Sequence, residues 1–529
     1  MRAGLGQARP VAAAEQVVAW AAARGLAEEQ TAALTLVLDG ADRAVNIEGR
    51  AGAAKTTTVG ALHEFAAARG YRAEGFGPTT GGVRALEEAG VGARTVASLL
   101  ENRIPANMAT RTFWIVDESS LLAPRQVNGL LRQARERGAD RVIFVGDQRQ
   151  HHAIEAGRPI LQLQQAGMPT ARLETIRRQR DSEVREAVAL AAAEKMVQAA
   201  ALLGEQRRIV AIADSQQRYR AIAHEYVRSH HAGNSTLVVS PANDARRALN
   251  EAIRTRLKLQ DLLGKQDYVA AILVSVDLIN SGALRPPAIS RATLSATTAA
   301  ATCMASGPAT MPWSDQRKAD NNYLRVTTRD GRTAAYDPRR LKGVQVFREE
   351  LRAFAEGERI QFRLPHRQLG IANGQFATIV AFDAAIGTAM LRLGRERLSK
   401  LNLKSFPHLD HGYALTSHAS QGATVDRVLI NIDTRSRELV NRKQFYVSLS
   451  RARHGALIFT DSREALPRAI SRTADKATAL DAIYASASQM RRDTSATRIQ
   501  RTVQTVTPGE SINRPEHAQR SRHELRMKM

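Results

Sequence analysis

Eight residues near the start of the chain have the spacing of a phosphate-binding loop. Gly49 opens the segment, and Lys55 and Thr56 close it, with Arg50 and four small residues between them. Such a loop joins a strand to a helix and wraps a phosphate chain with its backbone N–H groups. Lys55 would then reach the β- and γ-phosphates of a nucleotide, and the Thr56 hydroxyl would bind Mg²⁺. The pattern G-x-x-x-x-G-K-[ST] departs at Ala54, which replaces the second glycine.

The whole loop is expected to contact the nucleotide, although the segment alone could equally be an ordinary strand–turn–helix connection. The predicted contacts are Gly49, Gly52, Ala53, Ala54, Lys55, Thr56 and Thr57. Alanine adds one methyl group where the backbone approaches phosphate, and it is the smallest residue after glycine. We expect the loop to tolerate Ala54 if its φ angle stays negative.

Two acidic residues follow an apolar run that reads as a buried strand. Phe113–Val116 lead directly to Asp117 and Glu118. Ligands of parallel sheets bind beyond the carboxyl ends of such strands. Asp117 is predicted to hold the Mg²⁺ shell, and Glu118 to orient and deprotonate a water. An isolated Asp-Glu pair is more often a helix N-cap, so the nearby phosphate loop is what favours the catalytic role.

Two glutamines could also contact the nucleotide. Arg141–Gly146 read as another buried strand with a polar tip, in which Gln150 could sense the γ-phosphate. Gln30, in a helix before the loop, could pair with an adenine ring through its amide, although an isolated helical glutamine is usually exposed. His151 and His152 follow Gln150, and adjacent histidines seldom share a metal ion because they point in different directions.

An arginine far along the chain could complete the same site. The segment 444–453 places Arg451 and Arg453 at the start of a helix-like turn. An arginine from a second domain can stabilise charge on a transferring phosphoryl group, and closure of the cleft couples hydrolysis to motion. Without the other motifs, Arg451 would be read as a surface salt-bridge residue.

Alternating strand and helix patterns place these residues in two α/β domains. Residues 44–178 predict a doubly wound parallel sheet that binds ATP, preceded by a helical segment over 1–43. A second α/β domain is predicted for 179–280 and 401–475. Between its halves, 281–400 reads as strands and turns and predicts a small inserted β-barrel.

The overall composition favours a polyanionic partner. The 529 residues include 76 Lys and Arg against 52 Asp and Glu, a formal net charge of +24. Nucleic acid is the leading candidate, although an arginine-rich proteome would give the same excess. Residues 476–529 predict a basic, mobile tail. The single cysteine, Cys303, excludes a disulfide framework and multi-cysteine metal sites. With neither a signal-peptide core nor an apolar run of about 18 residues, we expect a cytoplasmic protein without membrane insertion.

Taken in order, these motifs resemble superfamily 1 helicases, and closely the helicase part of the MobF conjugative relaxases of the TraI/TrwC type. The resemblance covers about residues 11–475. It implies two RecA-like P-loop NTPase domains with a small SH3-like β-barrel insertion in the second, and ATP and Mg²⁺ as cofactors. It also implies 5′-to-3′ translocation on single-stranded DNA and unwinding of duplex DNA in conjugative plasmid transfer. A relaxase or a conjugative coupling protein is a candidate partner.

The resemblance also assigns roles to single residues. Gln30 matches the adenine-reading glutamine, Arg178 matches a γ-phosphate contact, and Arg451 matches the arginine finger. The implied catalytic set is Lys55, Glu118, Gln150, Arg178 and Arg451. The implied DNA contacts are Thr79, Thr80, Thr95, Thr416, His418 and Gln421. His408, His411 and His418 do not predict zinc, because the family match explains them as the run into a DNA-contacting motif.

The chain departs from the family in two further places. The nicking domain that precedes the helicase in the family is absent from this sequence, so we expect no strand-transfer activity of its own. Residues 282–314 lack the periodicity of a helix or a strand, where the family has a Tyr-x-x-Gly-Asp strand segment. Our hypothesis for this anomalous stretch is a pair of compensating frameshifts, which translation of the source DNA in the other frames would test.

Two other functions stay open at this point. The first is a RecD-like repair helicase, which shares these motifs and which gene neighbourhood would distinguish. The second is a non-hydrolysing remnant that only binds single-stranded DNA. Lys55, Glu118 and Arg451 argue against a remnant, whereas Ala54 and the stretch 282–314 argue for one.

Overall fold

The chain is described here from a computed structural model. It describes residues 4, 6–101, 111–153, 155, 157–275, 344–366, 368–383, 386–394 and 396–473, and the short strands 292–296, 310–311, 324–327 and 333–336. The predicted tail 476–529, Cys303 and most of 282–314 lie outside the described residues. Within the described part, no helix combines the length and the apolar character needed to cross a membrane.

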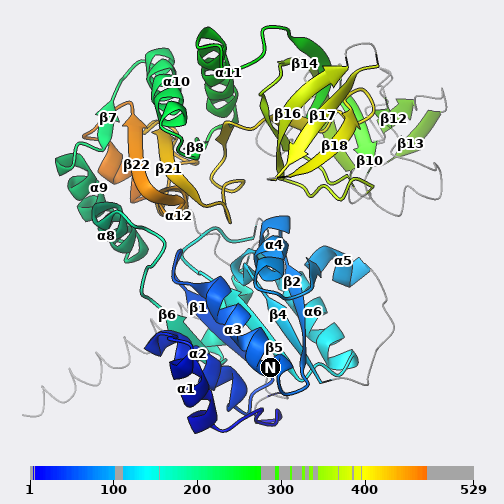
Figure 1. Ribbon diagram of the computed structural model, residues 1–529, viewed down its shortest axis with the longest axis vertical. Helices are drawn as coiled ribbons and strands as arrows, with labels where there is room; N and C mark the ends of the chain where they lie inside the picture. Colours follow the sequence, from blue (N-terminus) through cyan, green and yellow to red (C-terminus); the bar gives the residue numbers. More distant parts are fainter. Residues whose placement is uncertain are drawn as a thin grey trace, which may run out of the picture. The chain divides into compact units, whose positions relative to one another are not determined.

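A parallel sheet of six strands forms the centre of the first lobe, which comprises β1–β6 and α1–α7 (Figure 1). The strands lie in the order β3-β2-β4-β5-β1-β6, and all neighbours are parallel. They are β1 (Ala44–Gly49), β2 (Arg72–Gly77), β3 (Ala93–Thr95), β4 (Thr112–Val116), β5 (Arg141–Gly146) and β6 (Thr170–Leu173). The predicted parallel α/β arrangement is confirmed. From the sequence alone, 173–179 reads as a strand; in the structure β6 precedes most of that segment and ends at Leu173.

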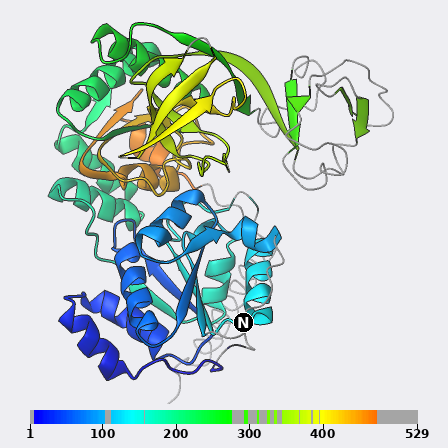
Figure 2. The same ribbon diagram turned by 45° about the vertical axis from the view of Figure 1, so that its right-hand side comes forward.

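Helices cover both faces of this sheet (Figure 1 and Figure 2) because alternate residues of its central strands point to opposite sides. Phe113 and Ile115 of β4 join a core with α1, α2 and α3. Trp114 and Val116 join a second core with α5, α6 and α7. The helices are α1 (Ala14–Ala23), α2 (Glu28–Leu38), α3 (Lys55–Ala67), α4 (Thr80–Glu88), α5 (Val96–Glu101), α6 (Pro124–Glu136) and α7 (Pro159–Gln165). Because both faces are covered, ligands reach the sheet at its strand ends.

The second lobe comprises another parallel sheet with its own helices. Its five strands lie in the order β20-β8-β21-β22-β7. They are β7 (Ile209–Ala211), β8 (Thr236–Val239), β20 (Ala414–Leu415), β21 (Val425–Ile432) and β22 (Ala452–Thr460). The helices are α8 (Ser182–Ala192), α9 (Met196–Glu205), α10 (Ser215–His231), α11 (Asn243–Leu259), α12 (Arg442–Leu449) and α13 (Leu466–Ile470). From the sequence alone, 180–235 reads as helices only; this is wrong, because the edge strand β7 interrupts the segment.

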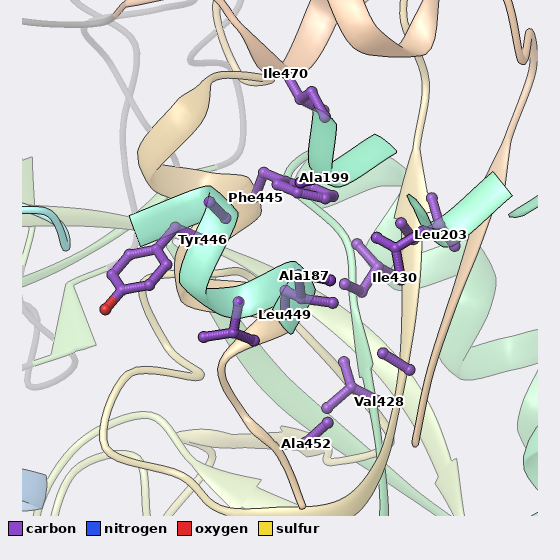
Figure 3. Packing of buried hydrophobic residues seen from close by; sticks show 14 of the residues in the cluster. Ala187, Ala199, Leu203, Val428, Ile430, Phe445, Tyr446, Leu449, Ala452 and Ile470 are labelled. Atoms are coloured by element: carbon purple, nitrogen blue, oxygen red, sulfur yellow. The ribbon is translucent and has the colours of Figure 1, made fainter. Parts of the chain in front are cut away.

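Helix α12 is held in place by the core of the second lobe. Phe445 and Leu449 are fully buried and pack in one cluster with Ala187 of α8 and Ile430 of β21 (Figure 3). Tyr446 lies at the edge of this cluster, with its hydroxyl directed away from the other labelled side chains (Figure 3). The packing therefore fixes the direction in which α12 presents that hydroxyl.

An antiparallel insertion separates the two halves of the second lobe. One sheet has the order β18-β17-β16-β15-β19, and a second has the order β11-β10-β14-β9. The strands are β9 (Tyr268–Ser275), β10 (Ala292–Ala296), β11 (Thr310–Met311), β14 (Val344–Phe354), β15 (Arg359–Phe362), β16 (Phe376–Asp383), β17 (Thr388–Leu393), β18 (Arg397–Asn402) and β19 (Leu409–His411), with a separate pair β12 (Leu324–Thr327) and β13 (Thr333–Tyr336). Ile272 and Phe354 share a core with Ile379 and Leu391, so the two sheets form one unit. The insertion begins with β9 and ends with β19, which is wider than the predicted 281–400, and its SH3-like character stays a prediction.

A buried network of charges connects this insertion to α11. Glu358 is fully buried and accepts hydrogen bonds from the Tyr413 hydroxyl (2.7 Å), Arg254 Nε (3.0 Å) and Ala355 N (3.2 Å). Burial and the Glu358 charge raise the pKa of Tyr413 well above its usual range. Tyr413 therefore stays protonated and acts as a donor. The network joins α11, which precedes the insertion, to Tyr413, which follows it.

Candidate nucleotide site

The predicted phosphate loop lies between β1 and α3. Ala54 precedes the first helical residue and has φ 58° and ψ 33°, which is the left-handed region. The condition that its φ angle stays negative is therefore wrong. The carbonyl of Ala54 accepts a hydrogen bond from the Thr58 amide at 3.0 Å, so the first helical hydrogen bond of α3 begins at this residue. Holding an alanine in this conformation costs about 1–2 kcal/mol, which a glycine would avoid.

Lys55 lies across the loop. Its ammonium donates hydrogen bonds to the carbonyls of Gly49 (2.7 Å) and Arg50 (3.1 Å). Burial lowers the pKa of Lys55, partly opposed by the charges of Asp147 and Asp117. A cation held only by neutral carbonyls and near two carboxylates is suited to exchange those carbonyls for phosphate oxygens. Thr56 and Thr57 are exposed, so their hydroxyls are accessible to a ligand.

The acidic pair follows β4 as predicted. Asp117 Oδ1 accepts the Glu118 amide at 2.8 Å. Burial and the neighbouring Glu118 charge raise the pKa of Asp117 to about 6. A carboxylate that is destabilised by burial gains from a bound cation, so Asp117 fits the predicted role of a Mg²⁺ ligand. Glu118 has φ 50°, also left-handed, and burial raises its pKa.

The second lobe reaches this site through α12. The Tyr446 hydroxyl accepts the amide N–H of Ala51 at 2.8 Å and donates to Asp147 Oδ2 at 2.8 Å. Gln150 Nε2 donates to the same carboxylate oxygen at 3.1 Å. Burial and the Asp147 charge raise the pKa of Tyr446 well above its usual range, so it stays a donor. One tyrosine thus joins the phosphate loop, the tip of β5 and the second lobe.

Two arginines meet beside the loop. A Cβ atom on Gly52, which has φ 85°, would lie 2.6 Å from the Cβ of Arg178. Arg178 donates to the carbonyl of Ser450 at 3.1 Å, and the adjacent Arg451 is 2% exposed. Burial and the Arg451 charge lower the pKa of Arg178 to about 9.

The bonds of Arg451 all go to neutral oxygens. It donates to the carbonyls of Val447 (2.8 Å) and Ala423 (3.3 Å) and to the Ser450 hydroxyl (2.8 Å). In the described part of the chain, neither Arg451 nor Arg178 forms an ion pair with a carboxylate. A buried and a half-buried cation that lack an ion-paired acid are complementary to an anion such as a nucleotide phosphate. Arg451 follows the end of α12, so its predicted position at the start of a helical turn is wrong.

Gln30 is used within the first lobe. Its Oε1 accepts the Ala27 amide (3.1 Å) at the start of α2, and its Nε2 donates to the Thr58 hydroxyl (3.2 Å) on α3. The Gln30 side-chain amide therefore connects the start of α2 to α3, the helix that follows the loop. Its adenine contact stays a prediction.

The predicted DNA contacts fall into two groups along the boundary between the lobes. Thr79 and Thr80 begin α4, and Thr95 ends β3. Thr416, His418 and Gln421 follow β20 in the second lobe. The His418 ring stacks on His151 of the first lobe at 3.6 Å between centroids, and His151 Nε2 hydrogen-bonds the Ser417 hydroxyl at 3.1 Å. The tip after β5 and the second lobe are therefore in direct contact.

One basic cavity has no counterpart among the predicted residues. It encloses about 510 Å³ and is lined by four arginines and no acid. Arg84 comes from α4, and Arg359, Arg392 and Arg397 come from the insertion. The Arg359 guanidinium lies 4.4 Å from the centroid of the Phe376 ring. The arginines are spread over more than 300 residues of sequence (84 to 397), so only folding collects them.

Comparison with known families finds two matches. Residues 25–214 match the AAA domain, and residues 411–459 match the UvrD-like helicase C-terminal domain. The multifunctional conjugation protein TraI of Escherichia coli is 26% identical over 85% of this chain, and the conjugal transfer protein TraA of Agrobacterium fabrum is 26% identical over 86%. This chain spans 28% of the length of TraI and 35% of TraA.

A solved structure of two coordinating Pif1 helicases at forked double-stranded DNA has a TM-score of 0.49 and 17% identity, and the match covers 89% of this chain and 97% of that chain. The two family models lie on the two lobes that meet at the phosphate loop. Together with the similarity to conjugal transfer proteins, they confirm the resemblance of this chain to superfamily 1 helicases.

Proposed function

We propose that this chain is an ATP-dependent 5′-to-3′ translocase on single-stranded DNA, which separates DNA strands during conjugative transfer. The observation that supports hydrolysis most directly is the buried Arg451 next to the half-buried Arg178 beside the loop, neither ion-paired with a carboxylate in the described part of the chain. Removing such cations from water is unfavourable unless an anion accompanies them. A triphosphate in the loop is that anion.

The described side chains would divide the steps of hydrolysis. Mg²⁺, held by Thr56 and Asp117, would neutralise phosphate charge. Lys55 leaves the loop carbonyls and binds the phosphates. Glu118 accepts a proton from the attacking water. Arg451 stabilises the charge that develops on the transferring group. In this proposal Gln30 contacts the adenine and Gln150 contacts the γ-phosphate. Each side-chain amide would give up one of its hydrogen bonds within the protein to bind the nucleotide.

Contacts between the lobes would convert hydrolysis into movement. Tyr446 and the stacked pair His151 and His418 connect them beside the loop. A bound nucleotide draws Arg451 of the second lobe towards Lys55 of the first, and its loss releases them. A strand bound along both lobes would then be gripped and released alternately.

The basic cavity provides a surface for the DNA backbone. Its four arginines can neutralise phosphates, and binding should weaken as salt concentration rises. The predicted contacts Thr80, Thr95, Thr416, His418 and Gln421 would extend this path between the lobes, whereas the predicted contact Thr79 is bonded to Glu118. The relatives named for conjugation favour that process over a repair role. A relaxase or a conjugative coupling protein is the proposed partner, and the cytoplasm the proposed site of action.

The decisive test is the rate of ATP hydrolysis with and without oligo(dT), in the wild type and in Lys55→Ala. We expect strong stimulation by oligo(dT), and loss of both rates in the variant because Lys55 supplies the ammonium that lies against the loop carbonyls of Gly49 and Arg50. Equal rates in the variant would refute the site. Binding of oligo(dT) without any hydrolysis in the wild type would instead identify a non-hydrolysing remnant.

Direction and DNA path are tested separately. A duplex with a 5′ single-stranded tail should be unwound, and one with a 3′ tail should not; the reverse result contradicts the proposed direction. Arg392→Glu should lower the affinity for oligo(dT) at least about tenfold. The matched control is Arg132→Glu, since Arg132 is 71% exposed on α6 and outside the cavity. Equal effects in both variants would exclude the cavity as the DNA path.

A further inference from the structure

The side chain of Glu118 is held by a residue that was expected to bind DNA. Thr79 Oγ1 donates a hydrogen bond to Glu118 Oε2 at 2.5 Å. The same hydroxyl accepts the amide of Gly82 at 3.1 Å, so Thr79 is also the N-cap of α4. The single proton of the hydroxyl is therefore donated to Glu118. A hydrogen bond from Thr79 to a DNA phosphate, which can only accept, would have to break this bond.

The rest of the Glu118 carboxylate is enclosed by backbone. A Cβ atom on Gly82 of α4 would lie 3.5 Å from Oε2, and one on Gly422 of the second lobe would lie 3.5 Å from Oε1. Thus one oxygen is bonded to the start of α4 and the other lies against the loop after β20. A carboxylate that accepts a short hydroxyl bond is less able to take a proton from water through that oxygen.

We propose that Thr79 is a positioning residue that keeps Glu118 from acting as the base until nucleic acid engages α4. This inference rests on the proposed function and adds its regulation. The hydroxyl bond is made in the resting protein, and its release frees Oε2 for the attacking water. Hydrolysis is thereby restricted to the DNA-bound protein.

Helix α4 connects this bond to the basic cavity. Arg84 lies one turn after Thr80 on the same helix and lines the cavity. Thr80 Oγ1 donates to the carbonyl of Asn373 in the insertion at 2.5 Å. A phosphate bound between Arg84 and the arginines of the insertion therefore acts on the helix whose first turn holds Glu118. Helix α4 is therefore the element through which phosphate binding in the cavity can affect the bond between Thr79 and Glu118.

The test replaces the hydroxyl without changing the shape of the side chain. Thr79→Val removes both bonds, whereas Thr79→Ser retains the hydroxyl. We expect Thr79→Val to raise the rate of ATP hydrolysis without DNA about ten- to hundredfold, the range of a lost hydrogen bond to a charged group. Stimulation by oligo(dT) should fall by the same factor, since the DNA-bound rate is unchanged. Thr79→Ser should keep the wild-type ratio.

Equilibrium binding of oligo(dT) without nucleotide separates this role from a direct DNA contact. We expect the affinity of Thr79→Val to stay within about twofold of the wild type, because the hydroxyl serves Glu118 and not DNA. The control for loss of a helix cap is Asp214→Ala. Asp214 accepts the Gln217 amide at 2.7 Å at the start of α10, outside the nucleotide site, so its basal rate should not rise.

The outcomes differ for the two proposals. A wild type that hydrolyses no ATP, or that oligo(dT) does not stimulate, overturns the proposed function and this inference with it. A stimulated wild type with an unchanged or lower basal rate in Thr79→Val overturns the inference alone. A lower DNA affinity with an unchanged basal rate would assign Thr79 to DNA instead.

Discussion

Replacing Ala54 with glycine tests the geometry of the phosphate loop directly. Ala54 is one of the described non-glycine residues with positive φ, at 58°. An L-residue in that region is destabilised by about 1–2 kcal/mol relative to glycine. Glycine also makes the unfolded chain more flexible, which offsets about 0.4–1 kcal/mol of the gain. We therefore expect Ala54→Gly to raise the free energy of unfolding of the first lobe by roughly 0.5–1 kcal/mol.

The neighbouring Ala53 is the matched control. It is 4% exposed and is not among the described residues with positive φ. Ala53→Gly relieves no strain, loses a buried methyl group worth about 0.8 kcal/mol, and gains the same unfolded-state flexibility. It should lower the free energy of unfolding by about 1–2 kcal/mol. The two changes are chemically identical, yet they have opposite predicted signs.

Urea unfolding without nucleotide, followed by tryptophan fluorescence, measures this difference. Trp20 and Trp114 both lie in the first lobe, and Trp114 is 2% exposed. A gap of about 2 kcal/mol between the variants corresponds to about 4–8 °C in thermal midpoint for a lobe of this size. If Ala54→Gly destabilises as much as Ala53→Gly, the left-handed conformation of Ala54 is refuted.

Three further outcomes follow from buried charges. Arg451→Lys should lower the DNA-stimulated rate of hydrolysis on the order of 10³-fold, because a lysine ammonium cannot keep the three hydrogen bonds of the guanidinium and also reach the phosphate. A loss below about tenfold in a steady-state assay would contradict the role of Arg451 as an arginine finger. The pKa of Asp117 is 3.8 in the unfolded chain and about 6 in the folded protein. The wild-type free energy of unfolding therefore falls as pH rises from 3.8 to about 6. Asp117→Asn should therefore be more stable than the wild type by up to about 3 kcal/mol at pH 8 without divalent metal, and no more stable at pH 4, as denaturant midpoints at the two pH values would show. Glu358→Ala should lower the free energy of unfolding by about 2–4 kcal/mol, because Arg254 Nε and the buried Tyr413 hydroxyl both lose their acceptor although Arg254 keeps its ion pair with Asp267. Glu356→Ala, at an exposed position, should change it by less than about 0.5 kcal/mol, and similar losses for the two variants in urea unfolding would refute the network.

Much of the fold followed from local patterns. The apolar runs of β4 and β5 predicted buried parallel strands, because strands covered on both faces are nearly continuous in apolar residues. The acids after β4 predicted a site at the strand ends, because helices cover both faces of such a sheet and leave the strand ends open to ligands. The edge strand β7 was missed, since three residues are too few to show a period. The bounds of the insertion were also missed, because β9 is defined by its pairing with β14 and not by its own sequence.

The site was less accessible from sequence. Tyr446 was recognised as part of a motif, yet its bond to Ala51 joins residues 395 positions apart. The bond from Thr79 to Glu118 and the collection of four arginines in one cavity have the same character. No local periodicity encodes such contacts, because they depend on how separately folded elements pack.

The sequence by itself determined which residues are available for chemistry: a lysine and a threonine after a small-residue loop, two acids after a buried strand, and an arginine far along the chain. Those choices are local, since each depends on a residue type and the element that carries it. Only the tertiary structure decided that Ala54 is left-handed, that Arg178 and Arg451 lie together without an acid in the described part of the chain, and that Thr79 holds Glu118. Backbone conformation in a tight loop and the pairing of buried polar groups are set by the atoms that surround them, and those atoms come from distant parts of the chain.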